Sequence, residues 1–426
     1  MSITKKYVFI LAYMVFTVEA WGQASSPFSS YGIGEYYGNA LAHNQGMAGI
    51  GVSQPQFWYL NNQNPALLVY NSLTVFQAGI VIEQRKISSG EVTEKQVGGN
   101  MNYLATAFPV KPGKWTTSLG LMPYTSVNYK IQSPVFIIDV NNVVVDTASG
   151  TVNGSGGLTQ LYWSNGVRIN RNFAVGLKAT YLFSSIETID KALLPDDVQP
   201  LRFLTGYDEK TNVKDFTFDV GVSFSKDSLG ARKNYRLSIG AVYGFATDLK
   251  ARKTDKLVLL STVGDTLISN EPSRTSGFIH LPSNFTGGIS LSRGSRWTVG
   301  TEFSYRDWSS FRSINKDQEG LGKSWRVALG AEITPDPVAI EKYLKRITYR
   351  TGVSVEQYPF FAGNNKVKDV GINFGLSLPT GRSSLDLAVK FGKRGNKNEN
   401  ILEENYFKIY FGITFNDQWF IKRKFD

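Results

Sequence analysis

The sequence has no cysteine, and only two of its 426 residues are histidine. The absence of cysteine excludes disulfide-stapled secreted scaffolds and zinc or iron–sulfur sites with cysteine ligands. The histidines, His43 and His280, form no metalloprotease motif, and there is no nucleophile elbow or phosphate-binding glycine loop. An outer-membrane lipase would have to rely on His280 beside Ser283, a weak candidate. We therefore expect no catalytic residues, no metal site and no cofactor.

Long hydrophobic runs are missing beyond the N-terminus, which excludes a helical membrane protein. At the N-terminus, two lysines precede an apolar run from Tyr7 to Val18, and small residues follow. This order predicts a secretory signal peptide over residues 1–22. Cleavage after Gly22 and cleavage after Ala24 both fit the pattern.

The formal charge of +11 raises the question of a nucleic-acid partner. The basic residues are scattered among strand-like segments and loops, and no basic helix is present. An exported chain also meets anionic lipid before it meets nucleic acid. We therefore predict no nucleic-acid partner, and expect contact with outer-membrane lipid and lipopolysaccharide.

From Leu73 onward the chain alternates apolar and polar residues, the period of strands with two different faces. In the clearest case, residues 297–306, Phe303 lies on the apolar face and Glu302 on the polar face. A soluble sandwich would bury the apolar face, whereas a transmembrane barrel turns it toward lipid. Strands of about ten to sixteen residues, with aromatics near their ends, favour the barrel. The predicted fold class is an all-β transmembrane antiparallel barrel.

About fourteen strands can be counted in the pattern, and an even number is expected of a bacterial barrel. Short connections alternate with long ones, among them Ile131–Gly157, Lys191–Asn212 and Arg252–Gly277. Two of the long connections have the pattern of hairpins, Val135–Val145 with a turn at residues 141 and 142 and Leu257–Ile268 with a turn at residues 264 and 265. Short turns are periplasmic in outer-membrane barrels, so both chain ends are predicted to be periplasmic. The predicted strands begin near Leu73, Asn100, Trp115, Leu158, Phe173, Val213, Lys233, Phe278, Arg296, Lys323, Arg346, Asp369, Ser383 and Glu403.

The stretch from Gln45 to Tyr70 is a poor strand, because its glycines and its Asn-Pro-Ala turn favour tight backbone turns. It also mixes apolar residues that need burial with Asn and Gln residues that need hydrogen-bond partners. A compact plug inside a polar-lined barrel satisfies both needs. We predict a hatch over residues 23–72 ahead of a barrel over 73–426, with these hatch residues: Gly46, Gly49, Gly51, Asn64, Pro65 and Ala66.

The order of motifs resembles the FadL-type long-chain fatty-acid transporters of the outer membrane. The resemblance begins with Gly-Met-Ala-Gly-Ile-Gly from Gly46 and Asn-Pro-Ala-Leu-Leu from Asn64, and continues in Leu-Pro-Ser-Asn-Phe from Leu281 and Asp-Trp-Ser-Ser-Phe from Asp307. It covers most of the mature chain. The family implies a fourteen-stranded barrel with an N-terminal hatch, which passes hydrophobic molecules inward and releases them through a gap in the wall.

Two segments bear on how far the resemblance extends. Residues 55–58, Pro-Gln-Phe-Trp, stand where the family usually has acidic and small residues, so the ligand need not be a fatty acid. The aromatic and basic ending, residues 419–425, resembles outer-membrane proteins of the Bacteroidota.

Charged residues on the polar faces are expected to point into the lumen, where water and opposite charges lower the cost of burial. They are Lys178, Asp219, Arg236, Glu302, Arg306, Asp386, Lys390 and Lys408. Apolar clusters in two of the long loops mark either a ligand-binding surface or residues that pack against each other. The candidate ligand-binding residues are Leu193, Leu194, Leu201, Phe203, Leu204, Leu257 and Leu259.

Two functions remain open at this point. The first is an outer-membrane channel for passive uptake of small hydrophobic molecules, either fatty-acid-like or aromatic. The second is a structural or plug subunit of a larger outer-membrane assembly, such as a secretion assembly. Neither requires an enzyme activity.

Overall fold

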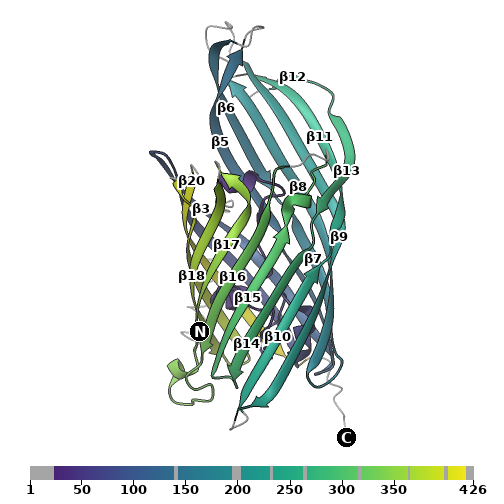
Figure 1. Cartoon of the computed structure of the whole chain (residues 1–426), viewed down its shortest axis with the longest axis vertical. Coiled ribbons are helices and arrows are strands. Elements are labelled where there is room, and N and C mark those ends of the chain that lie inside the picture. Colours follow the sequence, from purple (N-terminus) through teal and green to yellow (C-terminus); the bar gives the residue numbers. More distant parts are fainter. Residues whose placement is uncertain are drawn as a thin grey trace, which may run out of the picture.

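Fourteen antiparallel strands close into a barrel in the computed structural model (Figure 1). The structure describes residues 24–138, 143–193, 203–230, 234–261, 266–314, 319–362, 365–397 and 402–418. The predicted signal peptide and the C-terminal residues 419–426 lie outside these ranges. The last strand pairs with the first from Thr74↔Asp417 to Ser89↔Leu402, which closes the barrel. The strands of the wall are β2 (Thr74–Ser89), β3 (Val92–Lys111), β4 (Trp115–Pro123), β7 (Thr159–Arg168), β8 (Phe173–Leu193), β9 (Phe203–Leu229), β10 (Tyr235–Gly244), β14 (Asn284–Arg293), β15 (Trp297–Asp307), β16 (Lys323–Ile333), β17 (Thr348–Ala362), β18 (Asn365–Thr380), β19 (Ser383–Gly395) and β20 (Leu402–Asp417).

The predicted fold class and the fourteen strands are confirmed, whereas three predicted strand starts are wrong. β3 begins at Val92 rather than near Asn100, and β9 begins at Phe203 rather than near Val213, because the residues ahead of the alternating segments are mostly polar but still extend the strands. The strand expected near Phe278 is two strands in the structure: β13 (Ser273–Leu281) ends before Pro282, and β14 begins at Asn284. Proline lacks the backbone N–H that a continuous ladder requires, so the chain breaks there. The two strands then pair with different neighbours, β13 with β11 (Thr247–Ser261) and β14 with β10.

The two faces of the wall have the chemistry that the alternation predicts. On β15, Val299 and Phe303 are exposed on the outer face, while Glu302 and Arg306 are buried on the inner face. The same pattern recurs on β18, where Ile372 and its outward neighbours are exposed. An apolar outer surface over a polar interior is the arrangement of a membrane-spanning barrel. Among the described residues, no helix is long and apolar enough to cross a bilayer.

We expect Phe303→Arg to lower the free energy of unfolding by about 2 to 4 kcal/mol, because a charge would then lie on the lipid-facing surface. Glu302→Gln should cost less, since an amide oxygen can still accept the hydrogen bonds that Glu302 accepts inside the lumen. Folding titrations into lipid vesicles measure both variants, with Phe303→Leu as the control. The opposite order of stabilities would contradict the assignment of the faces.

A one-sided sheet rises above the wall at the end opposite the short turns (Figure 1). It continues β8 and β9 and adds β5 (Thr125–Ile138), β6 (Val144–Gly156), β11, β12 (Thr266–Ser269) and β13. β6 pairs with β5 and with the upper part of β8, and β11 pairs with the upper part of β9. We call this sheet the extension. The sequence predicted long connections here, and that prediction is wrong where Ile131–Gly157, Lys191–Asn212 and Arg252–Gly277 form strands. The two predicted hairpins are confirmed, because β5 pairs with β6 and β11 pairs with β12, while their predicted turn residues lie outside the described residues.

The extension branches from the wall at a pair of glycines. Gly156 and Gly157 have φ angles of +100° and +129°. A side chain at Gly157 would lie 2.9 Å from the Ser126 backbone. Glycine alone adopts such angles at low cost, and its missing side chain lets β5 and β6 leave the wall between β4 and β7.

Candidate functional site

The hatch segment, residues 24–72, lies inside the barrel and runs around its inner wall. It contains η1 (Pro27–Ser30), β1 (Glu35–Tyr36), α2 (Ala42–Gln45) and η2 (Pro65–Tyr70). Its residues contact wall glycines in the order of the strands, from Gly412 on β20 beside Ala42 to Gly166 on β7 beside Pro65. We call these wall residues the glycine belt: Gly166, Gly176, Gly221, Gly240, Gly288, Gly300, Gly330, Gly352, Gly375 and Gly412.

The glycine belt lets the hatch backbone approach the wall closely. A Cβ on Gly352 would lie 2.6 Å from the carbonyl carbon of Met47, and a Cβ on Gly330 would lie 2.7 Å from the Met47 carbonyl oxygen. Real Cβ atoms do not approach other atoms this closely. Gly300, Gly330 and Gly352 are register partners, as are Gly166, Gly176 and Gly221, so the belt follows one level of the barrel.

The predicted hatch glycines lie in the part of the hatch that contacts β14 to β18, which we call the first arc. Gly46 lies against Gly375, where an added Cβ would be 2.7 Å from the Gly46 Cα. Gly49 has a φ of +76°, a turn conformation that glycine tolerates. The backbone N–H groups of Gly51 and Val52 both donate to Glu302, at 3.0 Å each. Backbone donors on a buried carboxylate form charge-assisted hydrogen bonds, so Glu302 fixes this arc to β15.

The Asn-Pro-Ala turn forms the second arc. The Asn64 amide donates to the backbone oxygens of Val52, at 2.8 Å, and Val222, at 3.0 Å. Its side-chain oxygen accepts from the Ala66 N–H and caps η2. Asn64, Pro65 and Ala66 are fully buried. One side chain thus joins the two arcs of the hatch to the wall strand β9.

A cluster of four acidic and four basic side chains ties the hatch to β2, β18, β19 and β20. Glu35, the hatch member, lies 2.8 Å from Arg85, 2.8 Å from Arg394 and 3.9 Å from Lys408. Arg85 also contacts Glu404, at 3.3 Å. We call this set the Glu35 cluster; its other members are Glu83, Asp369 and Lys390.

The eight charged residues predicted for the lumen have inner-face positions. Lys178, Glu302, Arg306 and Asp386 are buried, and Arg236 pairs with Asp227 near a short turn. Lys178 donates to the Asn62 side chain of the hatch at 3.1 Å. Sequence reasoning identified Lys390 and Lys408 but missed the remaining members of the Glu35 cluster. The apolar–polar alternation within their strands could have identified the members on the wall, because it puts Arg85 of β2 and Glu404 of β20 on the inner face.

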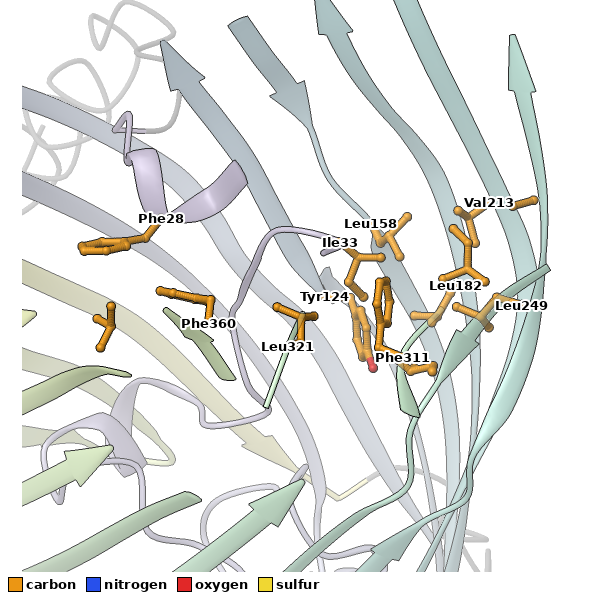
Figure 2. Close-up of a cluster of buried hydrophobic side chains, with 14 residues drawn as sticks. Phe28, Ile33, Tyr124, Leu158, Leu182, Val213, Leu249, Phe311, Leu321 and Phe360 are labelled. Carbon is orange, nitrogen blue, oxygen red and sulfur yellow. The ribbon is translucent and has the colours of Figure 1, made fainter. Parts of the chain in front are cut away.

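An apolar cluster joins the N-terminal part of the hatch to the wall and the base of the extension. Figure 2 shows Phe28 beside Phe360 and Ile33 near Tyr124 and Leu158. The Tyr31 and Phe360 rings are stacked with their centroids 4.5 Å apart. A cavity of about 330 Å³ adjoins this cluster, and aromatic residues of the hatch line it together with charged wall residues.

Five of the seven residues predicted to bind a ligand lie in the extension, and none of the five lines that cavity. Leu257 is exposed and Leu259 half-buried on β11. The backbones of Leu193 and Leu204 pair between β8 and β9, and Phe203 pairs with β11. Leu194 and Leu201 lie outside the described residues. The cavity is lined by other residues, so a ligand role for this set stays a prediction.

The longest stretch of a wall strand that is paired on a single side, within the described residues, lies on β3. β3 spans twenty residues but β4 only nine, and their ladder ends at Leu104↔Leu121. In the described part of the chain, residues 92–103 of β3 therefore pair only with β2. Met101, in this stretch, is exposed on the outer face.

The two histidines lie in different surroundings. His43 is buried and stacks on Tyr59 with ring centroids 4.3 Å apart. His280 lies 2.6 Å from Asp248 on the neighbouring strand β11. Within the described ranges, no group of three or more potential metal ligands is present.

Solved structures of channel proteins share the fold at low sequence identity. The toluene transporter TodX of Pseudomonas putida is 16% identical, with a TM-score of 0.57, and the match covers 91% of this chain and 100% of TodX. The CymD monoaromatic hydrocarbon channel is 14% identical, with a TM-score of 0.55 and coverage of 89% and 98%. A FadL homologue of Pseudomonas aeruginosa is 11% identical, with a TM-score of 0.55 and coverage of 89% and 98%.

Sequence comparison gives a different family from the one that the motifs resemble. No curated protein sequence matches the chain. Residues 3–426 match the family described as BamG. The FadL-type resemblance therefore holds for the fold, and by its sequence the chain belongs to the BamG family.

Proposed function

We propose that this protein is a closed outer-membrane barrel that serves as a structural subunit of a larger assembly. The observation that carries the proposal is the contact between the hatch and the glycine belt. Backbone atoms of the hatch lie where wall side chains would otherwise stand, around most of the barrel. Hatch movement would leave glycine-lined gaps and would separate the buried charges of the Glu35 cluster. A hatch that is fixed in the lumen suits a subunit that acts through its surfaces.

The extension and the family support the same proposal. The extension presents a broad one-sided sheet above the membrane-spanning wall, which offers a surface to a second protein (Figure 1). The sequence matches BamG over nearly its whole length, whereas the likeness to hydrocarbon channels is confined to the fold. In the proposed orientation the short turns and both chain ends are periplasmic, and the outer face contacts lipid and lipopolysaccharide.

Purification from native membranes tests the proposal directly. The tagged full-length protein, extracted in a mild detergent, is expected to carry a partner at fixed stoichiometry. The control is Phe303→Leu, which keeps an apolar residue on the lipid-facing surface. A solitary barrel with bound lipid, recovered under conditions that keep other membrane complexes intact, would contradict the proposal.

Passive uptake of small hydrophobic molecules is the second candidate, and the unpaired edge of β3 favours it. The missing ladder on one side of residues 92–103 would allow a sideways route between lumen and lipid to form there. The cavity between the hatch and the wall, lined partly by aromatic rings, offers room for a small ligand. Uptake of a labelled fatty acid or toluene by cells that do or do not express the protein tests this candidate.

A further inference from the structure

The connection between β16 and β17, residues 334–347, carries the two most exposed large apolar side chains among the described residues, and a third that is also strongly exposed. Ile340 is 93% exposed, Val338 83% and Leu344 69%. It is also the longest connection at the short-turn end and contains η5 (Tyr343–Lys345). Apolar side chains exposed to this degree within one short segment indicate a contact surface.

The connection is a folded loop whose own hydrogen bonds hold the apolar tip outward. The Asp336 N–H donates to the Lys345 carbonyl at 2.8 Å, which closes the base of the loop. Within the loop, the Ala339 N–H donates to the Asp336 carbonyl at 3.3 Å. The tip is therefore presented to its surroundings by a defined backbone.

Two tyrosines place the loop beside the lipid-facing surface. The Tyr349 hydroxyl donates to the Leu344 carbonyl at 3.2 Å, and Tyr349 is the register partner of Ile333. Both Tyr349 and Ile333 occupy outward positions, and Ile333 is exposed. The Tyr343 hydroxyl donates to the Pro379 carbonyl at the end of β18. In Figure 1 the loop is the light green segment at the lower left, which projects sideways from the wall.

Basic residues follow the apolar tip. Lys342 and Lys345 are exposed, and the Arg346 guanidinium lies 5.0 Å from the centre of the Tyr343 ring. Apolar side chains with tyrosine and lysine at the edge of a lipid-facing band are the composition of interfacial anchors. The adjoining lysines match the negative charge of phospholipid headgroups.

We propose that residues 334–347 form a membrane anchor, with Val338, Ile340 and Leu344 inserted into the leaflet next to the short-turn end. Lys342 and Lys345 then lie at the phosphate level. The occupant of this surface is phospholipid, because the apolar tip continues the lipid-facing surface of β16 and β17. The anchor would fix the rotation and depth of the barrel in the bilayer. The inference does not depend on whether the barrel is a subunit or a channel.

Site-specific fluorescent labelling tests the anchor. The sequence has no cysteine, so a single introduced cysteine is the only thiol that takes the label. Full-length protein with Ile340→Cys is labelled with a polarity-sensitive fluorophore. It is placed in nanodiscs of phosphatidylethanolamine and phosphatidylglycerol that contain a spin-labelled quencher lipid. We expect blue-shifted emission that the quencher lipid removes. The matched control is Ser295→Cys, on an exposed turn at the same end, which should stay in water and unquenched.

Two fluorescence results would overturn the proposed anchor. Emission from position 340 that equals emission from position 295 overturns it. So does a label that is shielded only when a copurified protein is present, because the surface would then bind protein. Val338→Cys repeats the measurement if Ile340→Cys does not fold. Lys342→Glu combined with Lys345→Glu should weaken quenching in discs that contain phosphatidylglycerol, and unchanged quenching would overturn the role of the lysines.

Discussion

Glu35→Ala is expected to lower the free energy of unfolding by about 3 to 5 kcal/mol, because it removes one partner of a buried ion pair. Arg85 and Arg394 each lie 2.8 Å from Glu35, and both are almost fully buried. Without Glu35 the remaining seven members of the cluster have one more positive than negative charge. Unfolding in urea measures the free energy of unfolding of the full-length protein, and the fraction folded is read from heat-modifiable migration on gels.

Asp227→Ala is the matched control, because it also removes the carboxylate of an ion pair with arginine. Asp227 and Arg236 are both substantially exposed. Exposed pairs contribute only about 0 to 1 kcal/mol. An equal loss of stability in the two variants would show that the Glu35 cluster does not hold the hatch to the wall.

Gly352→Ala is expected to displace the hatch while the barrel stays folded. The added methyl group would lie 2.6 Å from the Met47 carbonyl carbon and 2.7 Å from the Ala48 nitrogen, both backbone atoms of the hatch. Overpacking of this kind costs about 1 to 3 kcal/mol. The wall itself should tolerate alanine, because Gly352 lies within β17 and alanine suits a strand at least as well as glycine. Ion conductance across a planar bilayer should rise from a closed baseline to open steps.

Gly300→Ala is the matched control, because it adds the same methyl group to another glycine of the glycine belt, where the surrounding atoms leave more room. The nearest atoms to an added Cβ there lie at 3.3 Å, and the nearest hatch atom, on Ile50, lies at 3.6 Å. We expect this variant to stay closed. Open steps in both variants would mean that the close approach of hatch and wall does not keep the lumen shut.

The alternation predicted the wall well, because the wall strands have an apolar outer face and a polar inner face. Residues 297–306 of β15 show this contrast, and the observed faces follow it. In the extension the contrast is interrupted, because a charged residue also occupies a buried position. Lys253 of β11 lies among Glu209 and Asp255, and a segment of this composition has the pattern of a polar loop.

The contacts that hold the hatch were less accessible to sequence reasoning, because their partners are far apart in the chain. Gly352 looks like an ordinary strand glycine until Met47, some 300 residues earlier, is placed against it. Glu35 belongs to no periodic segment, and its partners come from three different strands. The Asn-Pro-Ala turn was accessible, because the turn chemistry of Asn64 and Pro65 is local.

The central claim is that the hatch stays fixed against the wall while the protein works, and a disulfide lock tests it most directly. A Cβ on Gly288 would lie 3.5 Å from the Ser53 Cβ, a separation that a disulfide can span, and the chain has no cysteine to compete. Cells that express Ser53→Cys with Gly288→Cys are compared in uptake of a labelled hydrophobic probe before and after reduction. The unaltered chain receives the same treatment as the control. We predict equal uptake in the locked and reduced states. Uptake that stops in the locked state and returns on reduction would contradict the account, because it would show that the hatch has to move.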